Sequence, residues 1–161
     1  MSNHYEIESG QLTPIDIDII KPIIQNAFGQ QLTFAYIKEL LETKPVVYLE
    51  KDCRGVAVVV PKPGEGLCAY MDILAVREDY QRNGLGSELI DRILKDQKPS
   101  KLAWRSKMER EINLWYSRIT DGQKIFEAKN KCQYYGYHIG LSPEEFGAMV
   151  KFMQQRPSHF E

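Results

Sequence analysis

The sequence predicts an α/β (α+β) protein built on a mixed β-sheet with helices packed against it. Two short β-rich runs, 45–49 and 56–60, are joined by a polar turn and are expected to form a hairpin. A third run, 67–76, leads through a glycine turn into an amphipathic helix over 85–94. A further strand at 101–105 follows that helix, so the helical crossover makes it parallel to the preceding strand.

Two helices are expected before the hairpin. Thr13 and Pro14 look like the N-cap and first position of a helix that ends near Gly29, because isoleucines recur there at helical spacing. Pro22 is expected to kink or split this helix. A second helix is expected after Thr33, with a buried stripe formed by Phe34, Ile37, Leu40 and Leu41.

The remaining elements follow the strand at 101–105. A helix is expected over 109–119, and then a hairpin of strands at 124–128 and 133–139. Ser142, Pro143 and Glu145 form a capping box that opens a last helix. With 161 residues the chain has room for one domain with a proper core, so residues 1–161 are expected to form a single domain.

Composition excludes several classes of function. Lysine and arginine number 21 against 22 acidic residues, a formal charge of −1, so no nucleic-acid partner is expected. No apolar run is long enough to span a membrane and the N-terminus lacks signal-peptide features, so no membrane partner and a cytoplasmic location are expected. The three cysteines form no Cys-x-x-Cys pair, so we expect reduced thiols and no metal.

The glycine turn between the strand at 67–76 and the helix at 85–94 is the first candidate binding site. The first N–H groups of a helix have no partners within it, and the helix dipole adds positive potential there, so phosphate is the expected ligand. Ser87 and Glu88 follow Gly86, which excludes a P-loop, and two glycines in mid-chain do not fit a dinucleotide fingerprint. The candidate residues are Gln81, Arg82, Asn83, Gly84, Leu85, Gly86 and Ser87.

The pattern Gln/Arg-x-x-Gly-x-Gly/Ala in this turn resembles the coenzyme A pyrophosphate loop of the GNAT superfamily of N-acyltransferases. The resemblance implies the GNAT fold, a central mixed, mostly antiparallel sheet with helices on both faces. It also implies acetyl-CoA, or another acyl-CoA, as cosubstrate. By the same resemblance, backbone amides of Leu74, Ala75 and Val76 are expected to bind the pantetheine arm.

A more specific pattern lies over residues 102–122, which read Trp-Arg-Ser, then Ile-Asn-x-Trp-Tyr, then Asp-Gly. Together with Tyr70-Met71-Asp72 it resembles the acetyltransferase domain of vertebrate-type N-acetylglutamate synthases. This implies transfer of an acyl group to the amine of a small amino acid, L-glutamate first of all, in arginine biosynthesis. The amino-acid kinase domain that many members carry upstream does not fit in this chain, so a freestanding transferase is expected.

Candidate residues for the chemistry come from the same segment. The planar guanidinium of Arg105 suits a carboxylate, Lys107 is expected on the same side of the strand, and Tyr70 is a third substrate-binding candidate. Tyr116 matches the tyrosine that acts as acid in the family. A tyrosine with a pKa of about 10 is protonated at neutral pH and can donate to a leaving thiolate whose pKa is about 8.5. Asn113, one turn earlier, is expected to orient substrate or sulfur.

Several alternatives stay open. The general base is Asp72, Glu109 or a water chain, and direct attack is favoured over acyl transfer through Cys68 because no histidine is close in sequence. Ile73 stands where the family has a substrate-binding lysine, so another amine acceptor competes with L-glutamate. The CoA loop of the family reads the pyrophosphate and not the acyl group, so succinyl-CoA as donor also stays open. A non-catalytic acyl-CoA-binding regulatory module is the alternative from another class. The oligomeric state is open, with a homodimer as one candidate.

Overall fold

A computed structural model describes residues 5–61, 68–97, 100–107, 110–120 and 134–156, and the backbone alone of residues 123–127 and 133. Its strands form one sheet in the order β1-β2-β3-β4-β5-β7-β6. The strands are β1 (Ile7–Gln11), β2 (Val46–Glu50), β3 (Gly55–Val60), β4 (Ala69–Val76), β5 (Leu102–Lys107), β6 (Gln123–Glu127) and β7 (Gln133–Ile139). The helices are α1 (Pro14–Phe28), α2 (Phe34–Glu42), the short 3-10 helix η1 (Glu78–Tyr80), α3 (Leu85–Asp96), α4 (Asn113–Ile119) and α5 (Pro143–Gln155).

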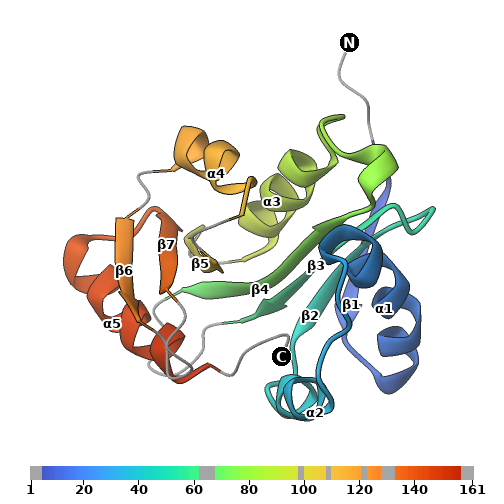
Figure 1. Cartoon of the computed structure of the whole chain (residues 1–161), viewed down its shortest axis with the longest axis horizontal. Coiled ribbons are helices and arrows are strands. Elements are labelled where there is room, and N and C mark those ends of the chain that lie inside the picture. Colours follow the sequence, from blue (N-terminus) through green and yellow to red (C-terminus); the bar gives the residue numbers. More distant parts are fainter. Residues whose placement is uncertain are drawn as a thin grey trace.

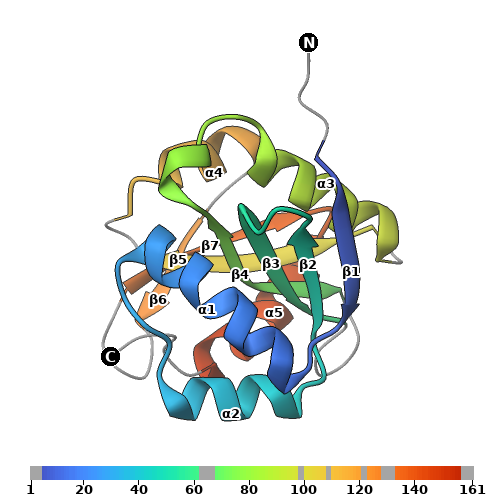
Figure 2. The same cartoon turned by 90° about the vertical axis from the view of Figure 1, so that its right-hand side faces the viewer.

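The predicted fold class is confirmed. Neighbouring strands pair antiparallel except for β4 and β5, which are parallel as the helical crossover requires. Helices cover both faces of the sheet (Figures 1 and 2). On one face Leu89 and Ile93 of α3 share a core with Trp104 of β5, and on the other Ile20 of α1 and Leu40 of α2 share a core with Val56 and Val58 of β3. A further helix, α5, covers Tyr70 and Ala103.

Several details differ from the expectations, and α4 begins at Asn113, later than the helix expected over 109–119. The strand β1 was not predicted, because four of its five residues are exposed and its sequence shows no apolar alternation. Pro22 does not split α1, which is continuous from Pro14 to Phe28. Phe34 is 83% exposed rather than buried, since α2 begins at this residue and turns Tyr36 and Leu40 towards the core.

A β-bulge in β4 lies next to the point where β4 and β5 stop pairing with each other. Val58 pairs with Ile73 and Val59 with Met71, so Asp72 is an extra residue on β4. Beyond this point β4 and β5 separate, and their ladder in the described chain consists of Ala69 with Leu102 and Tyr70 with Ala103. We call the segments that do not pair with each other, residues 71–76 of β4 and 104–107 of β5, the β4–β5 fork.

The turn between β2 and β3 yields a stability prediction. Glu50 is 1% exposed and accepts hydrogen bonds from the backbone N–H groups of Asp52 (3.0 Å) and Arg54 (3.1 Å) and from the Arg54 guanidinium (2.7 and 2.9 Å). The Arg54 side chain holds the pKa of Glu50 below its ordinary value. A lowered pKa in the folded state stabilises the fold above the unfolded-state pKa, and this contribution is lost as the pH falls through the folded-state value.

We therefore expect Glu50→Gln to lower the free energy of unfolding at pH 7 by about 1.5–3 kcal/mol, as for hydrogen bonds to a charged group. The loss should shrink as the pH falls below about 4, where the wild-type carboxylate becomes protonated. Urea unfolding at several pH values measures both effects. Glu42→Gln, at an exposed position of α2, is the control. An equal loss at acid and neutral pH would contradict this role of Glu50.

Candidate functional site

The loop between β4 and α3 begins at the end of β4 and leads through η1 to the N-terminus of α3 (Figure 1). The N-cap Gly84 has φ 87° and offers no side-chain cap to α3. The first backbone hydrogen bond of the helix runs from the Glu88 N–H to the Gly84 carbonyl at 3.0 Å, so the N–H groups of 85–87 precede the helical pattern. An uncapped helix N-terminus of this kind suits a phosphate group.

The two glycines of the loop have different tasks. Gly84 needs its left-handed φ of 87°, and its missing Cβ would meet open space. A Cβ on Gly86 would lie 3.2 Å from Cη2 of Trp115, so Gly86 allows α4 to pack closely against α3. The sequence pattern alone assigned both glycines to the ligand.

Gly84→Ala is expected to lower the free energy of unfolding by about 1 kcal/mol, because a side chain in the left-handed region is strained. The same strain should displace the loop amides and weaken CoA binding. Chemical unfolding and calorimetric titration with CoA measure the two effects. Gly10→Ala is the matched control, since its Cβ would also meet open space and its φ lies outside the left-handed region. Equal effects of the two substitutions would argue against the conformational requirement at Gly84.

Side chains tie this loop to the rest of the protein. The Gln81 amide donates to the Val76 carbonyl at 2.9 Å, and the Tyr5 hydroxyl donates to the Asn83 carbonyl at 3.1 Å. Arg82 is exposed with φ 67°, a left-handed conformation unusual for a residue other than glycine. Tyr5 carried no sequence signal, because its contact joins residues 78 positions apart.

One face of the β4–β5 fork carries a buried polar cluster. Tyr70 and Asp72 of β4 and Arg105 of β5 lie on this face, together with Arg156, the C-cap of α5. Asp72 and Arg156 form an ion pair, and each is 5% exposed. Arg156 also lies 3.8 Å from the Glu39 carboxylate of α2. Arg156 was missed by the sequence analysis, since nothing in its local sequence links it to β4.

Arg105 holds the end of α5. Its guanidinium donates to the Met153 carbonyl at 2.9 Å and to the Arg156 carbonyl at 3.4 Å, and it lies 4.5 Å from the centre of the Tyr134 ring. Lys107, two residues further along β5, is exposed and by strand alternation lies on the same face as Arg105. Of the two predicted acceptor-binding cations, Lys107 is therefore the accessible one.

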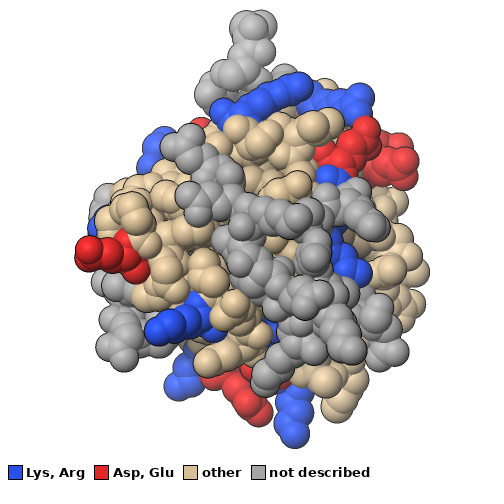
Figure 3. Space-filling view, turned by 60° about the vertical axis from the view of Figure 1, so that its left-hand side comes forward, with Lys and Arg blue, Asp and Glu red and all other residues tan. Residues whose placement is uncertain are grey.

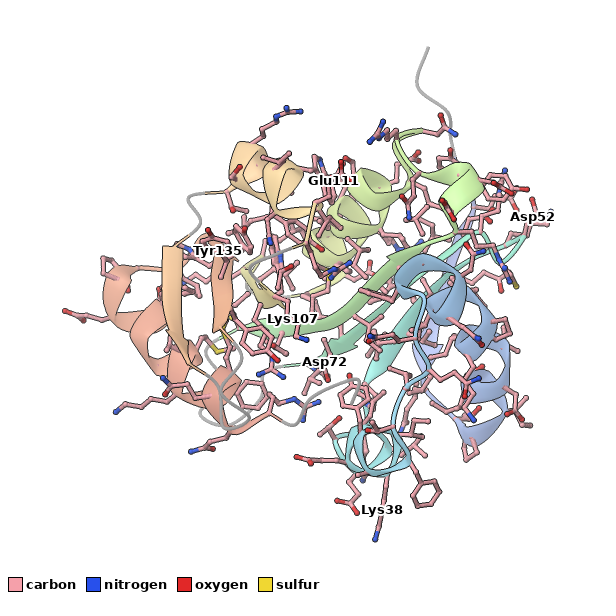
Figure 4. All side chains as sticks on the ribbon, viewed as in Figure 1. Lys38, Asp52, Asp72, Lys107, Glu111 and Tyr135 are labelled. Carbon is pink, nitrogen blue, oxygen red and sulfur yellow. The ribbon has the colours of Figure 1, made fainter. Side chains whose placement is uncertain are left out.

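Tyr70 is fully buried and packs edge-on against Phe152 of α5, with 5.1 Å between ring centres. Its hydroxyl has no hydrogen-bond partner among the described residues. Burial raises the pKa of Tyr70, so it stays protonated. Figure 4 shows Asp72 and Lys107 in the central part of the molecule, whereas Lys38 and Asp52 lie at its periphery.

Tyr116 lies on the opposite face of β5 from Arg105. It is 3% exposed and packs against Trp104 and Tyr137, with ring centres 5.2 and 5.1 Å apart. Its hydroxyl has no hydrogen bond within the described chain, and burial raises its pKa. The structure therefore does not bring Tyr116 into contact with Arg105.

Asn113 fixes the start of α4. Its amide N–H donates to the Lys107 carbonyl at 2.7 Å, and its carbonyl oxygen accepts from the Tyr137 hydroxyl at 2.9 Å. These bonds join α4 to β5 and β7, which positions Tyr116 one turn later. The structure therefore shows a positioning role for Asn113, and its interaction with substrate or sulfur stays a prediction.

The remaining candidates for acid, base or nucleophile differ in accessibility. Cys68 is fully buried, and burial raises the pKa of its thiol to about 12, so it is a poor nucleophile at neutral pH. Glu109 and Cys132 lie outside the described residues. Arg110, which the sequence analysis did not single out, lies with its guanidinium 4.2 Å from the centre of the Phe28 ring at the end of α1.

The described residues carry both signs of charge on the face in Figure 3 and form no cluster of metal ligands. Basic and acidic side chains are interspersed on the face in Figure 3, without a basic stripe across it. No group of three or more His, Cys, Asp or Glu side chains among the described residues is arranged to hold a metal ion. None of the described helices combines the length and apolar character needed to cross a membrane.

Comparison with known proteins identifies relatives of this chain. The zebrafish (Danio rerio) mitochondrial N-acetylglutamate synthase is 29% identical over 150 residues, which covers 92% of this chain and 27% of the relative. The chain thus spans about a quarter of that protein's length.

Solved structures share the fold at low sequence identity. An acetyltransferase from Thermus thermophilus has a TM-score of 0.64 at 14% identity, covering 84% of this chain and 97% of that chain. A Bacillus subtilis acetyltransferase in complex with CoA has a TM-score of 0.60 at 18% identity, covering 86% of this chain and all of that chain (100%).

The family comparison matches residues 6–155 to the family described as the N-acetyltransferase (NAT) of N-acetylglutamate synthase. This range contains the glycine loop, the β4–β5 fork, most of the buried polar cluster and Tyr116. The chain belongs to the N-acetyltransferase family of N-acetylglutamate synthase.

Proposed function

We propose that this protein transfers an acetyl group from acetyl-CoA to the amine of a small amino acid, with L-glutamate as the first candidate acceptor and arginine biosynthesis as the setting. The observation that carries this proposal is the β4–β5 fork, which opens after two paired residues towards the end of β4, where the loop to α3 begins. Family membership and the CoA complex of the Bacillus subtilis acetyltransferase support the choice of donor.

The donor would be held mainly by main-chain groups. The amides of residues 82–87 would bind the pyrophosphate, with Gln81 bracing the loop from Val76. The unpaired edge of β4 at residues 74–76 would bind the pantetheine arm, because strand edges offer N–H and C=O groups. The thioester supplies the acyl group.

Tyr116 would act on the leaving sulfur as a hydrogen-bond donor. Its raised pKa keeps the hydroxyl protonated over the neutral range. A thiolate has a pKa of about 8.5, so complete proton transfer from Tyr116 is uphill, while a hydrogen bond to the developing negative charge is favourable. Asn113 would hold the helix that carries Tyr116.

The acceptor would approach from the face that carries the polar cluster. Lys107 would bind a carboxylate, Arg105 would add positive potential behind it, and Tyr70 would form part of the wall. Asp72, buried in its ion pair with Arg156, would add negative potential on the side where the ammonium group approaches. Ile73 is 4% exposed and packs in the core with α1, so it adds no charge to this site.

A screen of donors and acceptors tests the proposal directly. We expect thiol release to be fastest with acetyl-CoA and L-glutamate. Faster release with succinyl-CoA or with another amine would reassign the donor or the acceptor. CoA binding by calorimetry without thiol release with any amine would favour a regulatory module and overturn the enzyme proposal.

The order of the reaction is a separate prediction. Because the Cys68 thiol is buried with a pKa of about 12, we expect the amine to attack the thioester directly in a ternary complex. Initial velocities at varied donor and acceptor concentrations should then give intersecting lines in double-reciprocal plots. Parallel lines, together with an acyl adduct on Cys68 in mass spectrometry, would contradict direct attack.

A further inference from the structure

Arg110 is a cation beside β5 to which the proposed reaction assigns no role. It follows β5 and precedes α4, and its backbone N–H donates to the Lys107 carbonyl at 3.3 Å. Its guanidinium carbon lies 4.2 Å from the centre of the Phe28 ring, at the last residue of α1. The side chain therefore leaves the β5–α4 segment and reaches the end of another helix.

This contact crosses from one face of the sheet to the other. Phe28 packs with the core formed by α1 and α2, whereas Tyr116 and Trp115 of α4 pack with the core on the α3 face. A side chain that contacts both layers must cross the plane of the sheet. It can do so only where β4 and β5 do not pair with each other, or beyond the ends of these strands. Arg110 therefore lies where a donor from the α3 side and an acceptor from the α1 side would meet.

Arg110 has no anionic partner in the part of the chain that the structure describes. The buried carboxylates Asp72 and Glu50 are paired with Arg156 and Arg54. The half-buried position of Arg110 disfavours its charge, and burial lowers the pKa of its guanidinium while the nearby Tyr116 opposes this shift. A cation withdrawn from water without a counter-charge is costly, and this cost is offset when a ligand supplies the anion.

The geometry favours a carboxylate over a phosphate as that anion. The uncapped amides of α3 already provide a phosphate site, whereas Phe28 belongs to the acceptor side. Stacking on the ring occupies one face of the guanidinium and leaves the N–H groups of its edge for a planar, bidentate partner. The side-chain carboxylate of an acidic amino acid has this shape.

We propose that Arg110, stacked on Phe28, binds a carboxylate of the acceptor and selects amines that carry one. This inference rests on the proposed function, because it assumes an acceptor in the β4–β5 fork. Arg110 is then a specificity-determining residue beside Lys107, and the acceptor is anchored on both sides of the fork.

Equilibrium binding tests the inference without requiring turnover. The full chain is saturated with CoA, and L-glutamate and L-glutamate dimethyl ester are titrated by calorimetry. The ester keeps the amine and lacks both carboxylates. We expect the wild type to prefer L-glutamate by at least about 10-fold, as for a charge-assisted bidentate pair. Arg110→Gln should weaken L-glutamate binding by about 10- to 100-fold and leave binding of the ester within about 2-fold.

Two further variants complete the design. Arg110→Lys keeps the charge without the planar guanidinium and should recover only part of the affinity for L-glutamate. Arg118→Gln, at an exposed position of α4, is the matched control and should leave both affinities unchanged. Circular dichroism of each variant confirms that it is folded.

Three results would overturn the inference. They are an equal loss of affinity for L-glutamate and its ester, a wild type without preference between them, and a loss of CoA affinity that accounts for the whole effect. Failure of the proposed function has a different signature, since it appears as no thiol release with any amine whatever the binding data are.

Discussion

Replacing Asp72 by alanine is expected to lower the free energy of unfolding by about 3–5 kcal/mol. The substitution removes the buried carboxylate that pairs with the Arg156 guanidinium, which is 5% exposed, and leaves the more exposed Glu39 carboxylate at 3.8 Å. Removal of one partner from a buried ion pair leaves an uncompensated charge, and this costs more than the pair itself contributes. Equilibrium unfolding in urea measures the change.

Two comparisons isolate this effect. Asp96→Ala removes the carboxylate of an ion pair with Arg92 that is 37% exposed on both sides, and it should cost less than about 1 kcal/mol. The double substitution Asp72→Ala/Arg156→Met should recover a large part of the stability lost in Asp72→Ala, because no charge is left buried. Additive losses in the double variant would contradict a direct pair between the β4 bulge and the end of α5.

Tyr116→Phe is expected to lower kcat by about 100-fold or more while CoA affinity stays nearly unchanged. The hydroxyl has no other hydrogen bond in the described chain, so its removal should leave the aromatic packing against Trp104 and Tyr137 intact. Steady-state kinetics and CoA titration separate the two quantities.

The control is Tyr48→Phe, which removes a buried hydroxyl that accepts from Gln97 at 3.2 Å outside the proposed site. Its kcat should equal that of the wild type. A Tyr116→Phe variant with wild-type turnover would remove Tyr116 from the mechanism, and a large loss of CoA affinity would indicate a binding task instead.

Local signals in the sequence predicted much of the fold. The N-cap Thr13 with Pro14 and the capping box at Ser142 place the starts of α1 and α5 correctly, because the residues that make each cap lie within three positions of one another. The glycine turn places α3 for the same reason, since the left-handed φ of Gly84 is a property of one residue. The parallel pairing of β4 and β5 followed from the helix between them.

Features that depend on distant residues could not be predicted in this way. The bulge at Asp72 appears only when β4 is aligned with β3, and Arg156 reaches Asp72 across 84 positions. Arg105 was expected at a substrate carboxylate, yet its hydrogen bonds go to carbonyls of α5, 48 and 51 positions away. The stacking of Arg110 on Phe28 likewise joins two elements that share no local pattern.

The central claim is that acyl-CoA lies in the β4–β5 fork with its pyrophosphate on the loop amides before and within the first turn of α3. Amide hydrogen exchange, measured with and without saturating acetyl-CoA, tests it most directly. The account predicts slower exchange at residues 74–76 and 82–87 and unchanged exchange in β1 and α2. No binding of acetyl-CoA, or protection confined to segments away from the fork and the loop, would contradict it.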